Sequence, residues 1–279
     1  MRSERHSPHA DWTTDISTPD PTPRTPSRLR GRIAVAGWSA LIALVLGIVV
    51  FVIWTQLVMP ADRAAAQTVF DNPAVTVTDT PDSVVITPAE GDSPAGLVFI
   101  PGAKVDPYAY LATLSGTVET TGLTVVITKP TLNLAFFDQR PLAAFTATAP
   151  DVSSWFVGGH SLGGVRACML AADTTAEVTV DGLVLFGSYC ASAVDDDLSV
   201  LSISGSDDGL STPAKIEATA DLLPADTTFV QIDGANHAAF GAYGAQPGDG
   251  VATIPPAESA QAIEDALGEF VVENSTLSE

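Results

Sequence analysis

The sequence predicts an α/β fold, with a mostly parallel central sheet, helices on both of its faces, and one transmembrane helix before it. Two observations lead to this prediction. Residues 33–59 form a long apolar run without a charge, and from about residue 74 short β-rich runs alternate with helical stretches. Such alternation is typical of a parallel sheet whose crossover helices cover it on both sides. The 279 residues supply enough material for one sizeable core, and neither internal repeats nor a second domain are evident.

The apolar run is long enough to cross a membrane. As a helix it extends about 40 Å, against a hydrocarbon core of about 30 Å. Four arginines, Arg24, Arg28, Arg30 and Arg32, precede it, whereas only Arg63 follows closely. The positive-inside rule therefore predicts a cytoplasmic N-terminus and an extracytoplasmic C-terminal domain. The alternative is a cleaved signal peptide, suggested by Ala64-Ala65-Ala66, but the apolar core of a signal peptide is usually only about 7–15 residues long.

The chain accordingly divides into four segments. Residues 1–32, rich in Pro, Ser, Thr and Arg, are expected to be a disordered cytoplasmic tail, residues 33–59 the transmembrane helix, 60–73 a linker, and 74–279 the folded domain. Charge is distributed unevenly: residues 60–279 contain 29 acidic residues but only six Lys and Arg, a balance of 6 − 29 = −23. A surface this acidic argues against nucleic acid or anionic lipid as a partner, and its plainest role is solubility.

Short apolar runs mark the expected strands. These are residues 75–77, 84–87, 97–100, 124–128, 155–158, 183–186, 198–204 and 229–232. Helices are expected at about 106–114, 162–172, 212–222 and 256–272, and the first and last of these have a proline near their start.

One stretch combines a strand, a sharp turn and a helix. The apolar run Trp155-Phe-Val157 leads into Gly159-His-Ser-Leu-Gly163, which fits the G-x-S-x-G pattern, and a helix follows. In this nucleophile elbow a serine lies on a strained strand-to-helix turn, with small neighbours that let the backbone bend tightly. Ser161 is therefore the candidate nucleophile. An idle serine in a glycine-rich turn is the alternative, since the pattern alone is weak.

A serine nucleophile needs a base and a group that orients the base. The folded domain contains only two histidines, and His160 lies inside the elbow on a backbone expected to direct its ring away from the serine. His237, in a loop after the strand 229–232, is then the candidate base. The orienting acid should follow a strand and precede the histidine, which leaves Asp207 and Asp208; the spacing Gly-x-x-Asp after the strand favours Asp208.

The oxyanion needs two backbone donors. One should be the N–H of Leu162, directly after the nucleophile, at the start of a helix. The second should come from the loop after an early central strand, where Ala103 is the best candidate and Lys104 the alternative; Pro101-Gly102 could also be no more than a turn.

From about residue 70 to 272 the chain resembles the α/β-hydrolase fold family, in particular its small, cap-free branch related to dienelactone hydrolases. The resemblance is carried by the elbow 159–164, by Gly182-Leu-Val-Leu-Phe-Gly-Ser-Tyr189 and by Asn236-His-Ala-Ala-Phe-Gly-Ala-Tyr-Gly244. It implies that residues 74–279 form a catalytic domain with the triad Ser161, Asp208 and His237, in the chain order of that fold. Two departures are present: many family members have His-Gly where this chain has Pro101-Gly102, and dienelactone hydrolases proper use a cysteine nucleophile.

These observations predict a membrane-anchored serine hydrolase that acts outside the cytoplasm on an ester or related acyl bond. An acyltransferase with the same triad, or a non-catalytic binding domain on this scaffold, is the alternative. No metal or other cofactor is expected, because the domain has neither a zinc-like ligand spacing nor a phosphate-binding glycine pattern. The expected partners are a small-molecule or lipid-like acyl substrate and, through residues 33–59, the membrane; Lys104, Phe136 and Tyr189 are candidate pocket residues.

Cys168 and Cys190 are the only cysteines. An even count in an oxidising compartment favours a disulfide. Cys168 lies two turns into the elbow helix and Cys190 just past the next strand, so the two can approach each other. The alternative is a pair of small, buried thiols.

Overall fold

The computed structural model describes residues 28–91, 95–173 and 175–275. The chain forms two units: the first ends at Val49 and the second begins at Val50. The first unit holds most of helix α1 (Arg28–Thr55). Residues Gly31–Thr55 of this helix have a mean hydropathy of 2.6, which makes them long and apolar enough to cross a membrane. The helix ends four residues before the predicted boundary at Met59. Residues 1–27 of the predicted tail lie outside the described residues, and residues 28–32 are already helical.

The second unit is built on one sheet of eight strands in the order β1-β2-β4-β3-β5-β6-β7-β8. Its strands are β1 (Val75–Asp79), β2 (Ser83–Pro88), β3 (Ala95–Ile100), β4 (Thr124–Thr128), β5 (Ser154–His160), β6 (Gly182–Phe186), β7 (Ser199–Gly205) and β8 (Thr228–Ile232). β2 pairs antiparallel with both β1 and β4, and every other pair is parallel. The predicted α/β fold with a mostly parallel sheet is therefore confirmed.

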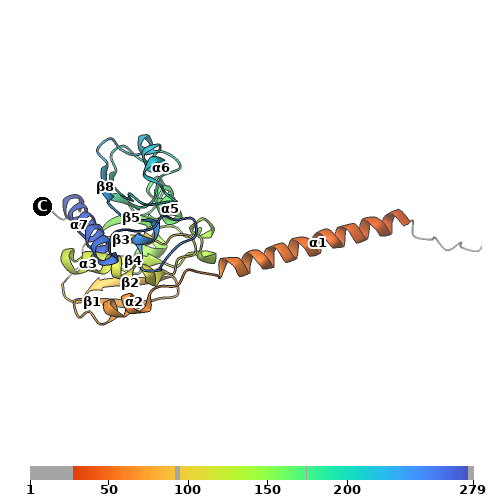
Figure 1. The fold of residues 1–279 in the computed structure, drawn as a ribbon, viewed down its shortest axis with the longest axis horizontal. Helices are drawn as coiled ribbons and strands as arrows, with labels where there is room; N and C mark the ends of the chain where they lie inside the picture. Colours follow the sequence, from red (N-terminus) through yellow and green to blue (C-terminus); the bar gives the residue numbers. More distant parts are fainter. Residues whose placement is uncertain (1–27, 92–94, 174, 276–279) are drawn as a thin grey trace, which may run out of the picture. The chain divides into compact units, whose positions relative to one another are not determined.

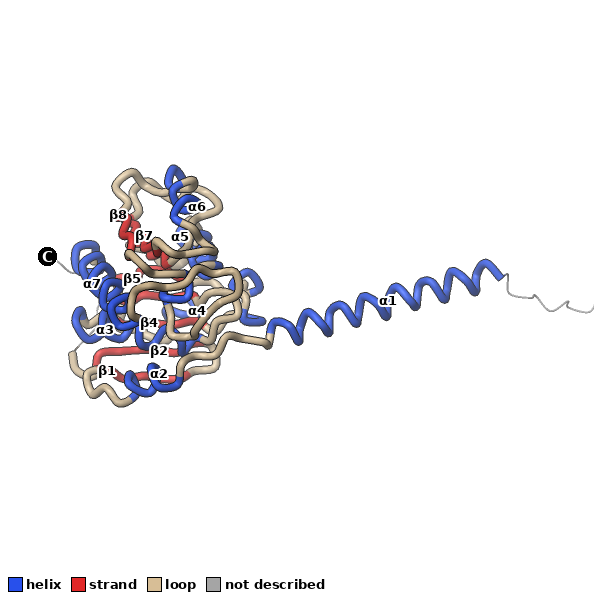
Figure 2. Tube along the Cα trace, viewed as in Figure 1, coloured by secondary structure: helices blue, strands red, loops and turns tan. Residues whose placement is uncertain are grey.

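Helices cover both faces of this sheet (Figures 1 and 2). The helices of this unit are α2 (Arg63–Phe70), α3 (Leu111–Thr121), α4 (Ala143–Thr146), α5 (Leu162–Ala171), α6 (Pro213–Glu217) and α7 (Pro256–Asn274). Helices α2, α3 and α7 contribute to the apolar cluster on one face, and α4 and α5 to the cluster on the other.

The central strands alternate between these two clusters. In β3, for example, Leu97 and Phe99 belong to the cluster under α3 and α7, whereas Val98 and Ile100 belong to the cluster under α5. All four are buried. Because both faces of a parallel sheet are covered, its strands are apolar at successive positions. This explains why these strands were recognised as continuous apolar runs rather than as alternating patterns.

The segment 60–73, which we predicted as a linker, is part of the folded unit. Asp62 caps helix α2 by accepting hydrogen bonds from the N–H groups of Ala64 and Ala65, at 2.8 and 3.0 Å. Val69 on this helix is buried in the cluster shared with α3. A helix of eight residues is too short to be stable alone, so this packing stabilises it. Such tertiary contact is not visible in the composition of the segment, which reads as polar and alanine-rich.

Candidate active site

The predicted nucleophile lies on a strained turn between β5 and α5. Ser161 has φ +53° and ψ −123°, a conformation that residues with a side chain rarely adopt. Such strain costs on the order of 1–3 kcal/mol and persists only where the surroundings impose it. Here the surroundings are tight: a Cβ on Gly163 would lie 2.0 Å from the carbonyl oxygen of Ile100, and one on Gly159 only 2.5 Å from the carbonyl carbon of Gly163. The glycines of the elbow are therefore required by close packing against the end of β3.

The predicted acid and base form a buried pair. Nδ1 of His237 lies 2.8 Å from Oδ2 of Asp208, and both side chains are fully buried. The other carboxylate oxygen of Asp208 accepts hydrogen bonds from the N–H groups of Leu210 and Ser211, at 2.8 and 2.7 Å. A carboxylate is an acceptor only, so His237 donates from Nδ1 and leaves the lone pair of Nε2 for a proton. Among the described residues that Nε2 has no hydrogen-bond partner.

The neighbouring acid has a different partner. Oδ2 of Asp207 accepts a hydrogen bond from the hydroxyl of Thr253 at 3.1 Å. The structure thus brings Asp208, and not Asp207, against the histidine.

The loop after β3 leaves one backbone donor free. The N–H of Gly102 donates to the hydroxyl of Tyr110 at 2.9 Å, and the N–H of Lys104 donates to the carbonyl of Asn133 at 2.8 Å. By contrast, the N–H groups of Ala103 and Leu162 donate no hydrogen bond to any described residue. Two free N–H groups, one beside the elbow serine and one on the adjoining loop, are what an oxyanion hole needs.

His160 packs against the candidate base, a contact that the sequence did not predict. Its ring is fully buried, with its centroid 4.4 Å from that of the His237 ring. Nδ1 of His160 lies 2.9 Å from the Tyr110 hydroxyl. Burial, and then the neighbouring His237, lower the pKa of His160 well below its usual value, whereas burial raises the pKa of Tyr110. The neutral imidazole of His160 therefore accepts a hydrogen bond from the Tyr110 hydroxyl. Because it carries no charge, it does not repel the imidazolium that His237 forms as a base.

The candidate pocket residues are not joined to this group. Lys104 has a left-handed backbone, with φ +59°, and its Nζ lies 4.1 Å from the ring centroid of Trp54. Phe136 is exposed and Tyr189 is half-buried. A cavity of about 450 Å³ lies between residues 143–155 and 177–181, at the start of β5 and so at the opposite end of that strand from Ser161, and none of the three lines it. A pocket-lining role for them stays a prediction.

The fold and this geometry can be compared with known proteins. The model of the "Alpha/beta hydrolase family" matches residues 96–261, well over half of the chain. The chain belongs to the alpha/beta hydrolase family. The predicted hydrolase fold is thus confirmed, while the suggested relationship to dienelactone hydrolases is not addressed by this match.

Esterases are among the solved structures that are similar to this hydrolase. The apo form of Thermogutta terrifontis esterase 2 is 14% identical, with a TM-score of 0.52 and coverage of 72% of this chain and 95% of that chain. The esterase domain of a Rhodothermus marinus protein is 15% identical, with a TM-score of 0.52 and coverage of 71% and 98%. At this identity the likeness shows the fold alone. No curated protein matches the hydrolase in sequence.

A further residue, Asp249, ties the acid loop to the histidine loop, and sequence reasoning missed it. Its Oδ1 accepts hydrogen bonds from the N–H groups of Gly209 and His237, at 3.1 and 3.0 Å, and its Oδ2 accepts from the N–H of Ala238 at 2.9 Å. The N–H of Gly250 also donates to Oδ1, at 2.7 Å. One carboxylate thus holds the backbones that carry both members of the Asp208–His237 pair.

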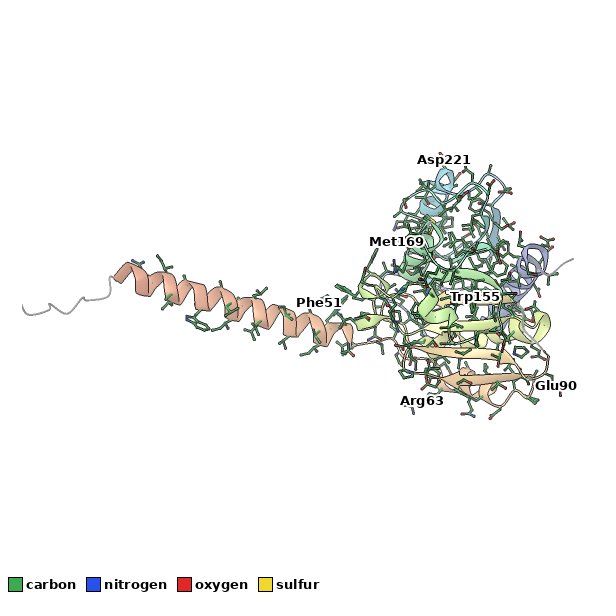
Figure 3. The ribbon with its side chains drawn as sticks, turned by 180° about the vertical axis from the view of Figure 1, so that it is seen from behind. Phe51, Arg63, Glu90, Trp155, Met169 and Asp221 are labelled. Carbon is green, nitrogen blue, oxygen red and sulfur yellow. A yellow bond between two sulfur atoms is a disulfide. The ribbon has the colours of Figure 1, made fainter. Side chains whose placement is uncertain are left out.

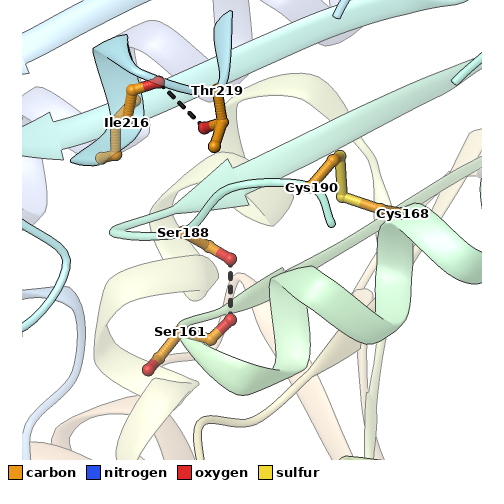
Figure 4. Close-up of a disulfide and its surroundings, with 6 residues drawn as sticks. All are labelled: Ser161, Cys168, Ser188, Cys190, Ile216 and Thr219. Atoms are coloured by element: carbon orange, nitrogen blue, oxygen red, sulfur yellow. Dashed lines mark hydrogen bonds between the residues drawn. A yellow bond between two sulfur atoms is a disulfide. The ribbon is translucent and has the colours of Figure 1, made fainter. Parts of the chain in front are cut away.

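Behind the elbow, Cys168 and Cys190 form a disulfide with Cα atoms 5.6 Å apart (Figure 4). It joins α5 to the connection after β6. Nearby, the hydroxyl of Ser188 donates to the carbonyl of Ser161 at 2.7 Å. The connection after β6 is therefore fastened to the elbow helix at two points. Within the described ranges, no group of three or more His, Cys, Asp or Glu side chains is arranged to hold a metal ion.

Proposed function

We propose that this hydrolase is a membrane-anchored serine esterase that acts outside the cytoplasm through Ser161, His237 and Asp208. The observation that carries the proposal is the buried Asp208–His237 hydrogen bond beside an elbow whose serine has a strained backbone. The esterases among the similar structures are consistent with this activity. We also infer membership in the small branch related to dienelactone hydrolases, supported by the connection 187–198, which contains no inserted helical cap.

In the proposed mechanism, Nε2 of His237 removes the proton of the Ser161 hydroxyl as its Oγ attacks the acyl carbon. Asp208 holds the Nδ1–H tautomer and stabilises the imidazolium that forms. The oxyanion accepts hydrogen bonds from the N–H groups of Leu162 and Ala103. The ester C–O bond then breaks, and His237 gives the proton to the leaving alcohol. Water, activated by the same histidine, attacks the acyl-serine and releases the acid.

Membrane anchorage is supported by how the chain continues after α1. A signal peptide cleaved at Ala64-Ala65-Ala66 would remove Asp62, which caps α2. It would also remove the hydrogen bond from the N–H of Asp62 to the carbonyl of Ala242, at 2.7 Å. Because the folded unit depends on these hydrogen bonds of Asp62, an uncleaved anchor is favoured over a cleaved signal peptide. The arginines before and within the first turns of α1 favour a cytoplasmic N-terminus, with the catalytic unit on the other side.

Ester hydrolysis by triad variants tests this proposal. We expect the full-length protein to hydrolyse p-nitrophenyl acetate, and Ser161→Ala to abolish the activity. Asp208→Asn should lower kcat by about 10³–10⁴, because the histidine loses the partner that fixes its tautomer. Asp207→Asn is the matched control, and its kcat should change little. Equal losses for the two aspartates would contradict the assignment of the acid.

A further inference from the structure

The chain that leaves α1 is hydrogen-bonded directly to the loops that carry the candidate site. The N–H of Met59 donates to the carbonyl of Lys104 at 2.7 Å, and the N–H of Asp106 donates to the carbonyl of Met59 at 3.0 Å. Three residues later, Asp62 bonds to Ala242 in the loop after His237. Residues 59–62 of the second unit therefore connect the proposed oxyanion loop with the histidine loop.

The last turn of α1 itself packs on a loop next to the site. The side-chain amide of Asn133 donates to the carbonyl of Thr55 at 3.0 Å, and the ring of Phe137 lies 5.7 Å from that of Phe51. The carbonyl of the same Asn133 accepts the N–H of Lys104, beside Ala103. All of these residues belong to the second unit. The end of the apolar helix and the proposed oxyanion loop are thus held by one short loop, residues 131–137.

Apolar side chains are exposed along this contact. We call them the apolar rim: Phe51, Trp54, Leu57, Phe136 and Phe137, each between 37% and 64% exposed. Phe51 is labelled in Figure 3, and its ring contacts that of Phe137 on the loop 131–137. An exposed cluster of large apolar side chains marks an interaction surface. This one is continuous with the end of the apolar helix, and aromatic side chains at such an end are typical of the boundary between membrane and water.

We propose that the apolar rim lies in the membrane surface and that the substrate of Ser161 is an acyl ester of a neutral or zwitterionic membrane lipid. The proposal rests on the function proposed above. An anchored helix must end at the interface, and the rim and the site loops are fastened to that end. The excess of acidic residues after residue 60 disfavours an anionic lipid.

In the reaction, Oγ of Ser161 bonds to the carbonyl carbon of the lipid ester. The bond from that carbon to the lipid alcohol breaks, and the alcohol oxygen takes the serine proton through His237. Water then cleaves the acyl-serine and yields a fatty acid. The products are one carboxylic acid and one lipid alcohol, with no redox change.

The position of the rim can be measured without activity. The full-length Phe137→Cys protein, labelled with a fluorophore in phosphatidylcholine vesicles, should be quenched strongly by nitroxide-bearing lipids. Phe229→Cys is the matched control, because Phe229 is similarly exposed but lies on the edge strand β8. With Cys168 and Cys190 bridged, each protein offers a single thiol. Equal, weak quenching of the two labels would overturn the proposal and would favour a protein partner for the rim.

The substrate class is tested with two esters in the same vesicles, a fluorogenic diacylglycerol in the bilayer and p-nitrophenyl acetate in solution. The double variant Leu57→Ser/Phe137→Ser should lose about tenfold or more of its rate on the lipid ester, with less than about twofold change on the soluble ester. Phe229→Ser should leave both rates unchanged. Equal losses on the two esters, or no loss, would overturn the inference. Turnover of the soluble ester alone by the native protein would overturn the lipid substrate but not the hydrolase, whereas no turnover of either would overturn both.

Discussion

Asp249→Ala tests whether one carboxylate outside the triad fixes the positions of Asp208 and His237 relative to each other. The substitution leaves four backbone N–H groups without their acceptor, those of Gly209, His237, Ala238 and Gly250. A hydrogen bond to a charged group contributes about 1.5–3 kcal/mol. Asp249 is half-buried, so water replaces part of the loss. We therefore expect the free energy of unfolding to fall by about 2–4 kcal/mol, less than the sum of four such bonds.

The effect on catalysis follows from the same contacts. With the loops of Asp208 and His237 no longer tied together, kcat on p-nitrophenyl acetate should fall by about 10–100-fold, measured well below the melting temperature of the variant. Asp233→Ala is the control, because Asp233 is exposed and forms no hydrogen bond with the described residues. A kcat within twofold of the native value, together with an unchanged free energy of unfolding, would refute the positioning role.

Four further outcomes are expected. Tyr110→Phe should lower the free energy of unfolding by about 1–3 kcal/mol, because it leaves the buried N–H of Gly102 and the buried Nδ1 of His160 unpaired. An unchanged denaturant midpoint would count against these two hydrogen bonds. Folding lowers the pKa of His160, so below the ordinary histidine pKa of about 6.5 the unfolded state binds one more proton than the folded state, and the free energy of unfolding falls as the pH falls. His160→Gln should reduce the slope of the free energy of unfolding against pH by up to about 1.4 kcal/mol per pH unit. An unaltered slope would contradict this. Gly163→Ala should strongly lower soluble expression or the melting temperature, because the added methyl group would meet backbone atoms; native stability would contradict the packing. Finally, thiol counting on the denatured, unreduced protein should find no free thiol at Cys168 or Cys190, and reduction should cost about 3 kcal/mol of stability for a loop of this length; two free thiols would refute the bridge.

Much of the fold could be predicted because its signals are local. Each central strand is a short apolar run and each crossover a helical stretch, so the layers follow from periodicity. The elbow also has a local signature, since Gly159 and Gly163 are needed for close approach on either side of Ser161. Ser161, Asp208 and His237 each follow the end of a parallel strand, which places all three at the same edge of the sheet.

The parts that could not be predicted depend on tertiary contact. Asp249 lies in a glycine-rich loop 12 residues after His237, and nothing local shows that its carboxylate folds back onto that histidine. The ring of His160 lies between Tyr110 and His237, with its Nδ1 bonded to the hydroxyl of Tyr110, and neither partner is near it in the chain. The pairing of Met59 with Val105 likewise joins segments too distant in the chain for periodicity to relate.

The central claim is that Ser161 is an activated nucleophile, and a fluorophosphonate probe tests it most directly. The full-length protein is incubated with the probe, digested, and the modified peptide identified by mass spectrometry. We predict stoichiometric modification at Ser161, none in Ser161→Ala, and much slower modification in His237→Ala. A correctly folded native protein that remains unmodified, or modification at another residue, would contradict the account.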